Sequence, residues 1–301
     1  MSMPINTASI RRLLRPGLAM VFSNTTAYPL ECFELFSKHK SDKQQEITVE
    51  VKMLPVAQMK AEGDSIAFEG MAERYATSFL NQTAAIGYII TREACLDCLY
   101  KDEFPMGAVA MRDSLLQYKN IQGASILNNG FSSSYPLADG VPFFSTLHPV
   151  DGGFVANTPT ANMGLNETSI QDALKGIQRF KSASGIKVVA KPQKLVVPTD
   201  LQFAAEVLLG SKYQTGTANN NISSIFNQGY FPRGYTTNHF LTNQANWYIL
   251  TDVPGMKYFE REPVITNIFT DIDTNNLKVS AFERYCFGVD NFRSAWGVQG
   301  I

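Results

Sequence analysis

The chain closes on Arg284-Tyr-Cys-Phe-Gly-Val-Asp-Asn-Phe-Arg293, the last of four segments whose order decides the fold. The first is Val141-Pro-Phe-Phe-Ser-Thr-Leu-His-Pro149, which is followed by an amphipathic helix. The second is Lys194-Leu-Val-Val-Pro-Thr-Asp-Leu-Gln-Phe-Ala-Ala-Glu-Val-Leu-Leu209, and the third is the short strand Trp247-Tyr-Ile-Leu250. None of the four has the residue pattern of an active site. Their order along the chain is therefore more informative than any single side chain.

The composition is that of a globular protein with one large core or two modest ones: 301 residues, 45% hydrophobic and 18% charged. The formal net charge of -1 argues against a general nucleic-acid binder, which needs surplus Lys and Arg to neutralise phosphates. No apolar run reaches the length of a transmembrane helix. A short helix is expected near the amino terminus, capped by Ser9 and ended by Pro16-Gly17.

Cys95-x-x-Cys98 is the one cysteine pair with a chemical spacing, that of a redox dithiol or half a zinc site. Neither a second such pair nor paired histidines are available to complete a zinc site, so we expect no metal and no cofactor. The bland interpretation is that these two thiols, like Cys32 and Cys286, are small apolar fillers.

His148 is the histidine that could begin a hydrolase site, because Ser145 and Asp151 lie close to it in the sequence. No Gly-x-Ser-x-Gly elbow precedes it, and dinucleotide and P-loop motifs are also missing. We expect His148 to be a loop residue that hydrogen-bonds to backbone, and we expect no catalytic residue in the chain. His39, His239 and the acidic group Asp97, Asp102 and Glu103 are interpreted in the same structural way.

Residues 46–53 alternate strictly, with Ile47, Val49, Val51 and Met53 on one face, which predicts a half-buried strand. A Gly63-Asp64 turn follows, and Ile66 and Phe68 are expected in the returning strand, so Leu54 to Asp64 would form the tip of a long hairpin. The hairpin has too few apolar residues for a core of its own. It presents unpaired backbone and therefore needs a partner.

A strand at 85–90 precedes two helical segments. Thr91 is placed to cap the first, which should pause at Phe104-Pro105, and the second should run to Ile126 and stop at Asn128-Asn-Gly130. Its apolar stripe is expected to comprise Met111, Leu115, Tyr118 and Ile121.

Two further helices begin with a capping-box spacing, Thr168-x-x-Gln171 and Thr199-x-x-Gln202. Short strands are expected between them at 186–190 and 194–197. Later strands are expected at 247–250, 256–259, 264–269 and 277–289, where Glu283 alone interrupts the apolar face of the last. These elements predict an α+β protein.

In segment order, residues 46–298 resemble the major capsid proteins of tailed phages, which have the Hong Kong 97-type fold, and in particular the Mu-like head subunits. The stretches that carry the resemblance are Glu62-Gly-Asp-Ser65, Thr91-Arg-Glu93, Lys194 to Leu209, and Phe287-Gly-Val-Asp-Asn-Phe-Arg293. The resemblance implies six parts: an amino-terminal arm at 1–45, an extended hairpin loop at 46–79, a peripheral domain with a spine helix at 80–139, an axial domain at 140–254, a peripheral β-hairpin at 255–290 and a carboxyl-terminal segment at 291–301.

The resemblance also implies that the chain assembles as pentamers and hexamers into an icosahedral shell around double-stranded DNA, in the cytoplasm of a bacterial host. Its partners would be other copies, a scaffolding protein, a portal and a decoration protein, with no membrane. The expected inter-subunit residues are those of the hairpin: Met59, Lys60, Glu62, Asp64, Phe68 and Arg74. Because only about 45 residues precede the hairpin, scaffolding is expected from a separate protein, and no Lys–Asn crosslink is expected.

Two alternatives remain open from the sequence. An encapsulin-type bacterial nanocompartment shares the fold and packages enzymes in place of DNA. A soluble α/β hydrolytic enzyme would use the loop from Phe143 to Asp151.

Overall fold

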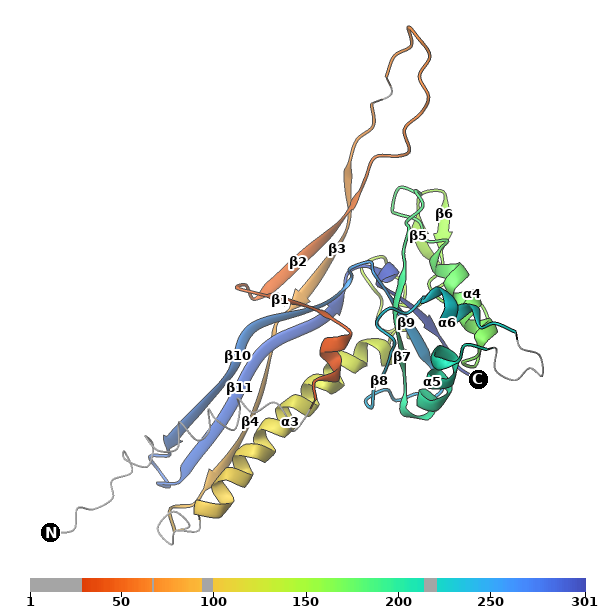
Figure 1. Ribbon diagram of the computed structural model, residues 1–301. Coiled ribbons are helices and arrows are strands. Elements are labelled where there is room, and N and C mark those ends of the chain that lie inside the picture. Colours follow the sequence, from red (N-terminus) through yellow and green to blue (C-terminus); the bar gives the residue numbers. More distant parts are fainter. Residues whose placement is uncertain (1–28, 67, 94–99, 214–220) are drawn as a thin grey trace, which may run out of the picture. The chain divides into compact units, whose positions relative to one another are not determined.

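The computed structural model describes residues 29–66, 68–93, 100–213 and 221–301 (Figure 1). The chain forms two compact units, each made of separate stretches of sequence: the first draws on Met1–Gln45, Leu80–Gly123 and Tyr258–Cys286, and the second on Glu46–Phe79, Ala124–Lys257 and Phe287–Ile301. The short amino-terminal helix and the Cys95–Cys98 pair that the sequence predicts lie outside the described residues.

The first unit is built on a four-stranded sheet with the order β1-β10-β11-β4. Its strands are β1 (Ser37–Lys40), β4 (Gln82–Ile90), β10 (Met256–Thr270) and β11 (Leu277–Val289), and η2 (Glu31–Glu34) precedes them. β11 pairs antiparallel with β4, from Leu277 opposite Ile90 to Tyr285 opposite Gln82. The long helix α3 (Tyr100–Asn128) packs Ala108, Met111 and Leu115 against Ile268 and Val279 of this sheet.

The second unit contains a sheet with the order β12-β9-β7-β8, in which β7 runs antiparallel to β9 and parallel to β8. These strands are β7 (Pro192–Val197), β8 (Tyr235–Thr237), β9 (Trp247–Thr251) and β12 (Ala295–Val298). The helical segments are α4 (Glu167–Ile177), η3 (Thr199–Leu201), α5 (Gln202–Gly210), α6 (Ser224–Gln228) and η4 (Phe292–Ser294). A small ladder joins β5 (His148–Val150) to β6 (Gly153–Val155). Apolar runs in β7 and β9 form the centre, because both strands are buried along almost their whole length.

The second unit also carries the hairpin of β2 (Gln45–Lys52) and β3 (Ala72–Leu80), which Figure 1 shows continuing into an open loop. The predicted turn is present, and Gly63 adopts a φ of +89° that favours glycine. The tip is longer than expected, because Ile66 and Phe68 lie in irregular chain and the returning strand begins only at Ala72. The alternate spacing of Ile66 and Phe68 is typical of a strand, but among the described residues no strand pairs with this segment.

The helix α3 corrects two details of the prediction. It is continuous from Tyr100 through Pro105, because losing one amide donor near a helix start does not end the helix. Its buried face passes through Lys119, while Tyr118 and Ile121 are exposed. Lys119 replaces an apolar residue there because it pairs with Glu283, the residue that interrupts β11.

Other predicted boundaries also change. The strands expected at 256–259 and 264–269 are one continuous strand, β10, and 186–190 makes only an isolated bridge between Lys181 and Lys187. The cap of α4 is Asn166, whose side chain accepts from the Ser169 amide, and Thr168 lies inside the helix. Thr199 caps nothing: it opens a 3-10 turn, and its hydroxyl bonds to Gln244.

Candidate assembly site

The hairpin has two chemically different faces, and the half-buried strand β2 that the sequence predicts turns its apolar face outward. The polar residues of β2 are half-buried, whereas its apolar residues are exposed. The exposed fractions are 63% for Ile47, 38% for Val49, 44% for Val51 and 60% for Met53. A strand that packed only against its own subunit would bury these side chains. The apolar face is therefore left uncovered by the part of the chain that the structure describes.

Three contacts hold the hairpin to the rest of the second unit. The carboxylate of Glu50 accepts from Arg293 Nη1 at 3.1 Å, and Lys52 Nζ lies 2.6 Å from Asp151 Oδ2. The Ser184 hydroxyl donates to the carbonyl of Met53. We call these contacts the hairpin clamp.

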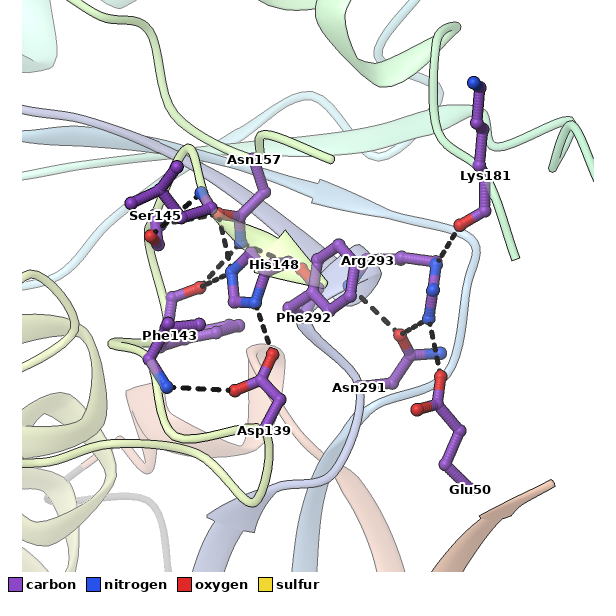
Figure 2. Close-up of polar contacts among 12 residues, drawn as sticks. Glu50, Asp139, Phe143, Ser145, His148, Asn157, Lys181, Asn291, Phe292 and Arg293 are labelled. Carbon is purple, nitrogen blue, oxygen red and sulfur yellow. Dashed lines mark hydrogen bonds and ion pairs between the residues drawn. The ribbon is translucent and has the colours of Figure 1, made fainter. Parts of the chain in front are cut away.

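Arg293 is the buried centre of the clamp and is only 5% exposed. Its Nε donates to the Lys181 carbonyl at 2.6 Å, and its Nη1 also donates to Asn291 Oδ1 at 3.1 Å, as Figure 2 shows. Burial lowers the pKa of Arg293, and the nearby Glu50 opposes that shift. These bonds fix the guanidinium in a single orientation, so Glu50 meets a preformed donor.

A buried polar network supports the segment that carries Arg293. Asn157 donates to the carbonyls of Phe143 at 2.7 Å and Phe292 at 3.0 Å, and it accepts from the Ser145 amide at 2.9 Å. The His148 ring stacks on Phe292 with 3.8 Å between centroids (Figure 2). Phe292, the residue before Arg293, is thus held by Asn157 through its carbonyl and by His148 through its ring.

His148 does not form a hydrolase site. Its Nδ1 lies 2.6 Å from Asp139 Oδ2, and its Nε2 lies 3.2 Å from the Phe143 carbonyl, which confirms the expected backbone contact. The expected loop position is wrong, because His148 begins the strand β5 and pairs with Val155. Ser145 accepts from the Leu147 amide and Asp151 pairs with Lys52, so neither is bound to the imidazole. The ring is fully buried, so a substrate could not reach it.

The six predicted inter-subunit residues do not form one cluster. Met59, Lys60, Glu62, Asp64 and Phe68 are exposed along the open loop, whose limbs enclose a hollow of about 710 Å³. Arg74 is on β3, where its guanidinium lies 4.9 Å from the Tyr75 ring. The clamp was not predicted from the sequence, although charged residues at alternate positions of an otherwise apolar strand were a signal for it.

The described residues contain no group of three His, Cys, Asp or Glu side chains that could hold a metal ion. Within the same residues, no helix is both long enough and apolar enough to cross a membrane.

The fold is similar to that of several solved shell proteins. The capsid of an empty GTA particle gives a TM-score of 0.56 at 11% identity, covering 95% of this chain and 97% of the other. The virus-like particle from Pyrococcus furiosus gives 0.55 at 10% identity, covering 96% and 98%. Mycobacterium phage Patience gives 0.55 at 9% identity, covering 100% and 90%. At these identities the likeness establishes the α+β fold of the Hong Kong 97 type.

No curated protein matches the chain. A family model described as phage capsid protein matches residues 82–298, which is most of the sequence. This match includes α3, β4, β10, β11 and the whole sheet of the second unit. The chain therefore belongs to the phage capsid protein family.

Proposed function

We propose that the chain is the major head subunit of a tailed phage, with the Mu-like head subunits as its subgroup. Copies assemble as pentamers and hexamers into an icosahedral shell around double-stranded DNA, in the cytoplasm of a bacterial host. A separate scaffolding protein, a portal and a decoration protein complete the particle. The assignment of 1–45 as arm, 46–79 as extended loop, 80–139 and 255–290 as peripheral domain, 140–254 as axial domain and 291–301 as carboxyl-terminal segment belongs to this proposal.

The observation that carries the proposal is the hairpin. Its shaft leaves the apolar side of β2 exposed, and its open loop exposes Met59 and Phe68 almost completely. Apolar surface of this extent on a slender element is typical of an interaction site. In a shell, another copy is present at every such position, and heterologous contacts of this type close into rings.

Deletion of Ala57 to Ser65 tests the role of the loop. The deletion removes the tip and leaves β2, β3 and the clamp in place. We expect soluble subunits or capsomers but no stable shells, as judged by negative-stain electron microscopy and sedimentation. The chain without the deletion, expressed with the proposed scaffolding protein, is the control. Normal particles from the deletion variant would refute the loop assignment.

A second candidate is an encapsulin-type compartment, because such a shell would have the same fold, and the fold is similar to that of the Pyrococcus furiosus virus-like particle over nearly the whole of both chains. The two functions differ in content. Particles purified from the native host would contain nuclease-protected double-stranded DNA in a phage head and a folded enzyme in a compartment. Finding a stoichiometric enzyme and no DNA would replace the first proposal by the second.

A further inference from the structure

The side chains of β2 alternate between a half-buried polar face and an exposed apolar face. Glu46, Thr48, Glu50 and Lys52 are on the half-buried side, and Ile47, Val49, Val51 and Met53 are on the exposed side. Because side chains alternate along a strand, whatever fixes one face also fixes the direction of the other. The orientation of the apolar face is thus decided by the contacts of the polar face.

These contacts are spaced so that they prevent rotation of the strand. Glu50 and Lys52 are successive residues of the polar face, and they pair with two side chains of opposite charge: Glu50 accepts from Arg293, and Lys52 donates to Asp151. A one-residue slip or a half-turn of β2 would place apolar side chains against Arg293 and Asp151. It would leave the buried guanidinium of Arg293 without its carboxylate, and an unpaired buried charge is strongly unfavourable.

The clamp has a rigid part and an adjustable part. Arg293 is buried and is held by Lys181 and Asn291 independently of the hairpin. The Lys52–Asp151 pair is more open, with 39% and 46% of the two side chains exposed. An exposed ion pair contributes little stability by itself. An isolated two-stranded hairpin is also only marginally stable, so even a weak ion pair should measurably change how often the hairpin adopts this orientation.

We propose that Arg293 and Asp151 are positioning residues for assembly. They hold the polar face of β2 against the subunit's own body and thereby present the stripe Ile47, Val49, Val51 and Met53 to a second copy of this chain. The inference rests on the proposed function as a shell subunit. It adds that the shaft of the hairpin, and not only its tip, is a contact surface.

A second copy is the occupant that fits this stripe. The stripe carries no charge and spans about 20 Å along the strand, so it matches an apolar protein surface and not DNA. The chain belongs to a family of capsid subunits, in which each copy is surrounded by others.

Charge reversal at the exposed pair tests the clamp without disturbing a core. Asp151→Lys should accelerate amide hydrogen exchange in β2 and β3 of the free subunit about fivefold and lower the shell yield. Lys52→Asp with Asp151→Lys restores an attractive pair and should return both readouts to their original values. Asp172→Lys is the matched control, because Asp172 forms an exposed ion pair with Lys175 on α4.

Val49→Asp tests the stripe separately. It should leave amide exchange in the free subunit unchanged and abolish shells, whereas Val49→Ile should assemble normally. Unaltered exchange and assembly in Asp151→Lys would overturn the positioning role, and normal shells from Val49→Asp would overturn the contact surface. If the unsubstituted chain and its scaffolding protein gave no shells, the proposed function would fail, yet exchange in the free subunit would still report on the clamp.

Discussion

Lys119 and Glu283 form a buried ion pair inside the first unit, with 2.5 Å between Nζ and Oε2. The rings of Phe33, Tyr258 and Tyr285 surround the ammonium group at 5.9, 5.9 and 5.0 Å. Burial raises the pKa of Glu283, and the attraction of Lys119 opposes this shift. Burial also raises the pKa of the nearby Cys32 thiol to about 12. A buried ion pair of this kind contributes little net free energy to folding. Removing one partner is nevertheless strongly destabilising, because the other charge is then buried without compensation.

Removing Lys119 should therefore be severe. We expect Lys119→Met to lower the free energy of unfolding by about 3–5 kcal/mol, and the double variant Lys119→Met with Glu283→Leu to recover most of that loss. Equilibrium urea unfolding of the free subunit measures both. Equal losses in the single and double variants would contradict the account.

The raised pKa of Glu283 also predicts a pH dependence. The folded chain holds the carboxyl proton more tightly than the unfolded chain, whose reference value is 4.5. Stability from this group is thus fully present below that value and is lost as pH rises through the folded-state pKa. In Lys119→Met, unfolding free energy should fall as pH rises above 4.5. Adding Glu283→Gln should remove that slope, and a slope that persists would assign it to other groups.

At the scale of elements, the residue that caps α4 differs from the one that the sequence pattern predicts. Asn166 Oδ1 accepts from the Ser169 amide at 2.8 Å and from the Ser169 hydroxyl at 2.9 Å. Thr168, which the capping-box spacing favours, is exposed within the first turn. Asn166 and Thr168 are both polar residues that could cap the helix. Asn166 is the N-cap because its backbone is extended, as an N-cap residue requires, whereas Thr168 is already inside the helix.

Asn166→Ala should lower the free energy of unfolding by about 1 kcal/mol, because one cap bond is lost and the first amides of α4 remain without a partner. Thr168→Ala should change it by less than about 0.5 kcal/mol. Thermal unfolding of the two variants, compared with the unsubstituted chain, checks the assignment. A larger effect at Thr168 than at Asn166 would reverse it.

At the scale of the whole molecule, the chain is a capsid subunit that associates with copies of itself, and its exposed loop is the part that association should protect. Lys60 is the one basic residue between Lys52 and Arg74 in the sequence, and it is exposed in the loop. Irregular exposed chain is the preferred substrate of proteases, because it can enter an active site without unfolding the rest.

Trypsin should therefore cut the free subunit first after Lys60 and leave the two compact units intact. If the proposed contact covers the loop with a neighbouring copy, the same bond should be protected in assembled particles. Time-resolved digestion with mass spectrometry gives the cleavage order in each state. Equal cleavage rates in free subunits and shells would show that the loop stays uncovered on assembly.

The sequence by itself determined the local elements and their order, because strand alternation and helix periodicity depend on near neighbours. β2, the long helix α3 with its stop at Asn128, and the order of segments were predictable in this way, and so was the resemblance to phage capsid proteins. The turn at the tip of the hairpin was also predictable, because Gly63-Asp64 favours a turn and Gly63 adopts the positive φ that suits glycine.

Only the tertiary structure decided which way the elements face. The Arg293 that anchors Glu50 is 243 residues distant, and the Glu283 that accepts Lys119 on the buried face of α3 is 164 residues distant. Alternation in β2 showed that it had two faces but could not say which one meets the subunit. That choice depends on a buried guanidinium and an exposed carboxylate that folding brings beside β2, because turning the strand over would leave the guanidinium of Arg293 without its carboxylate partner.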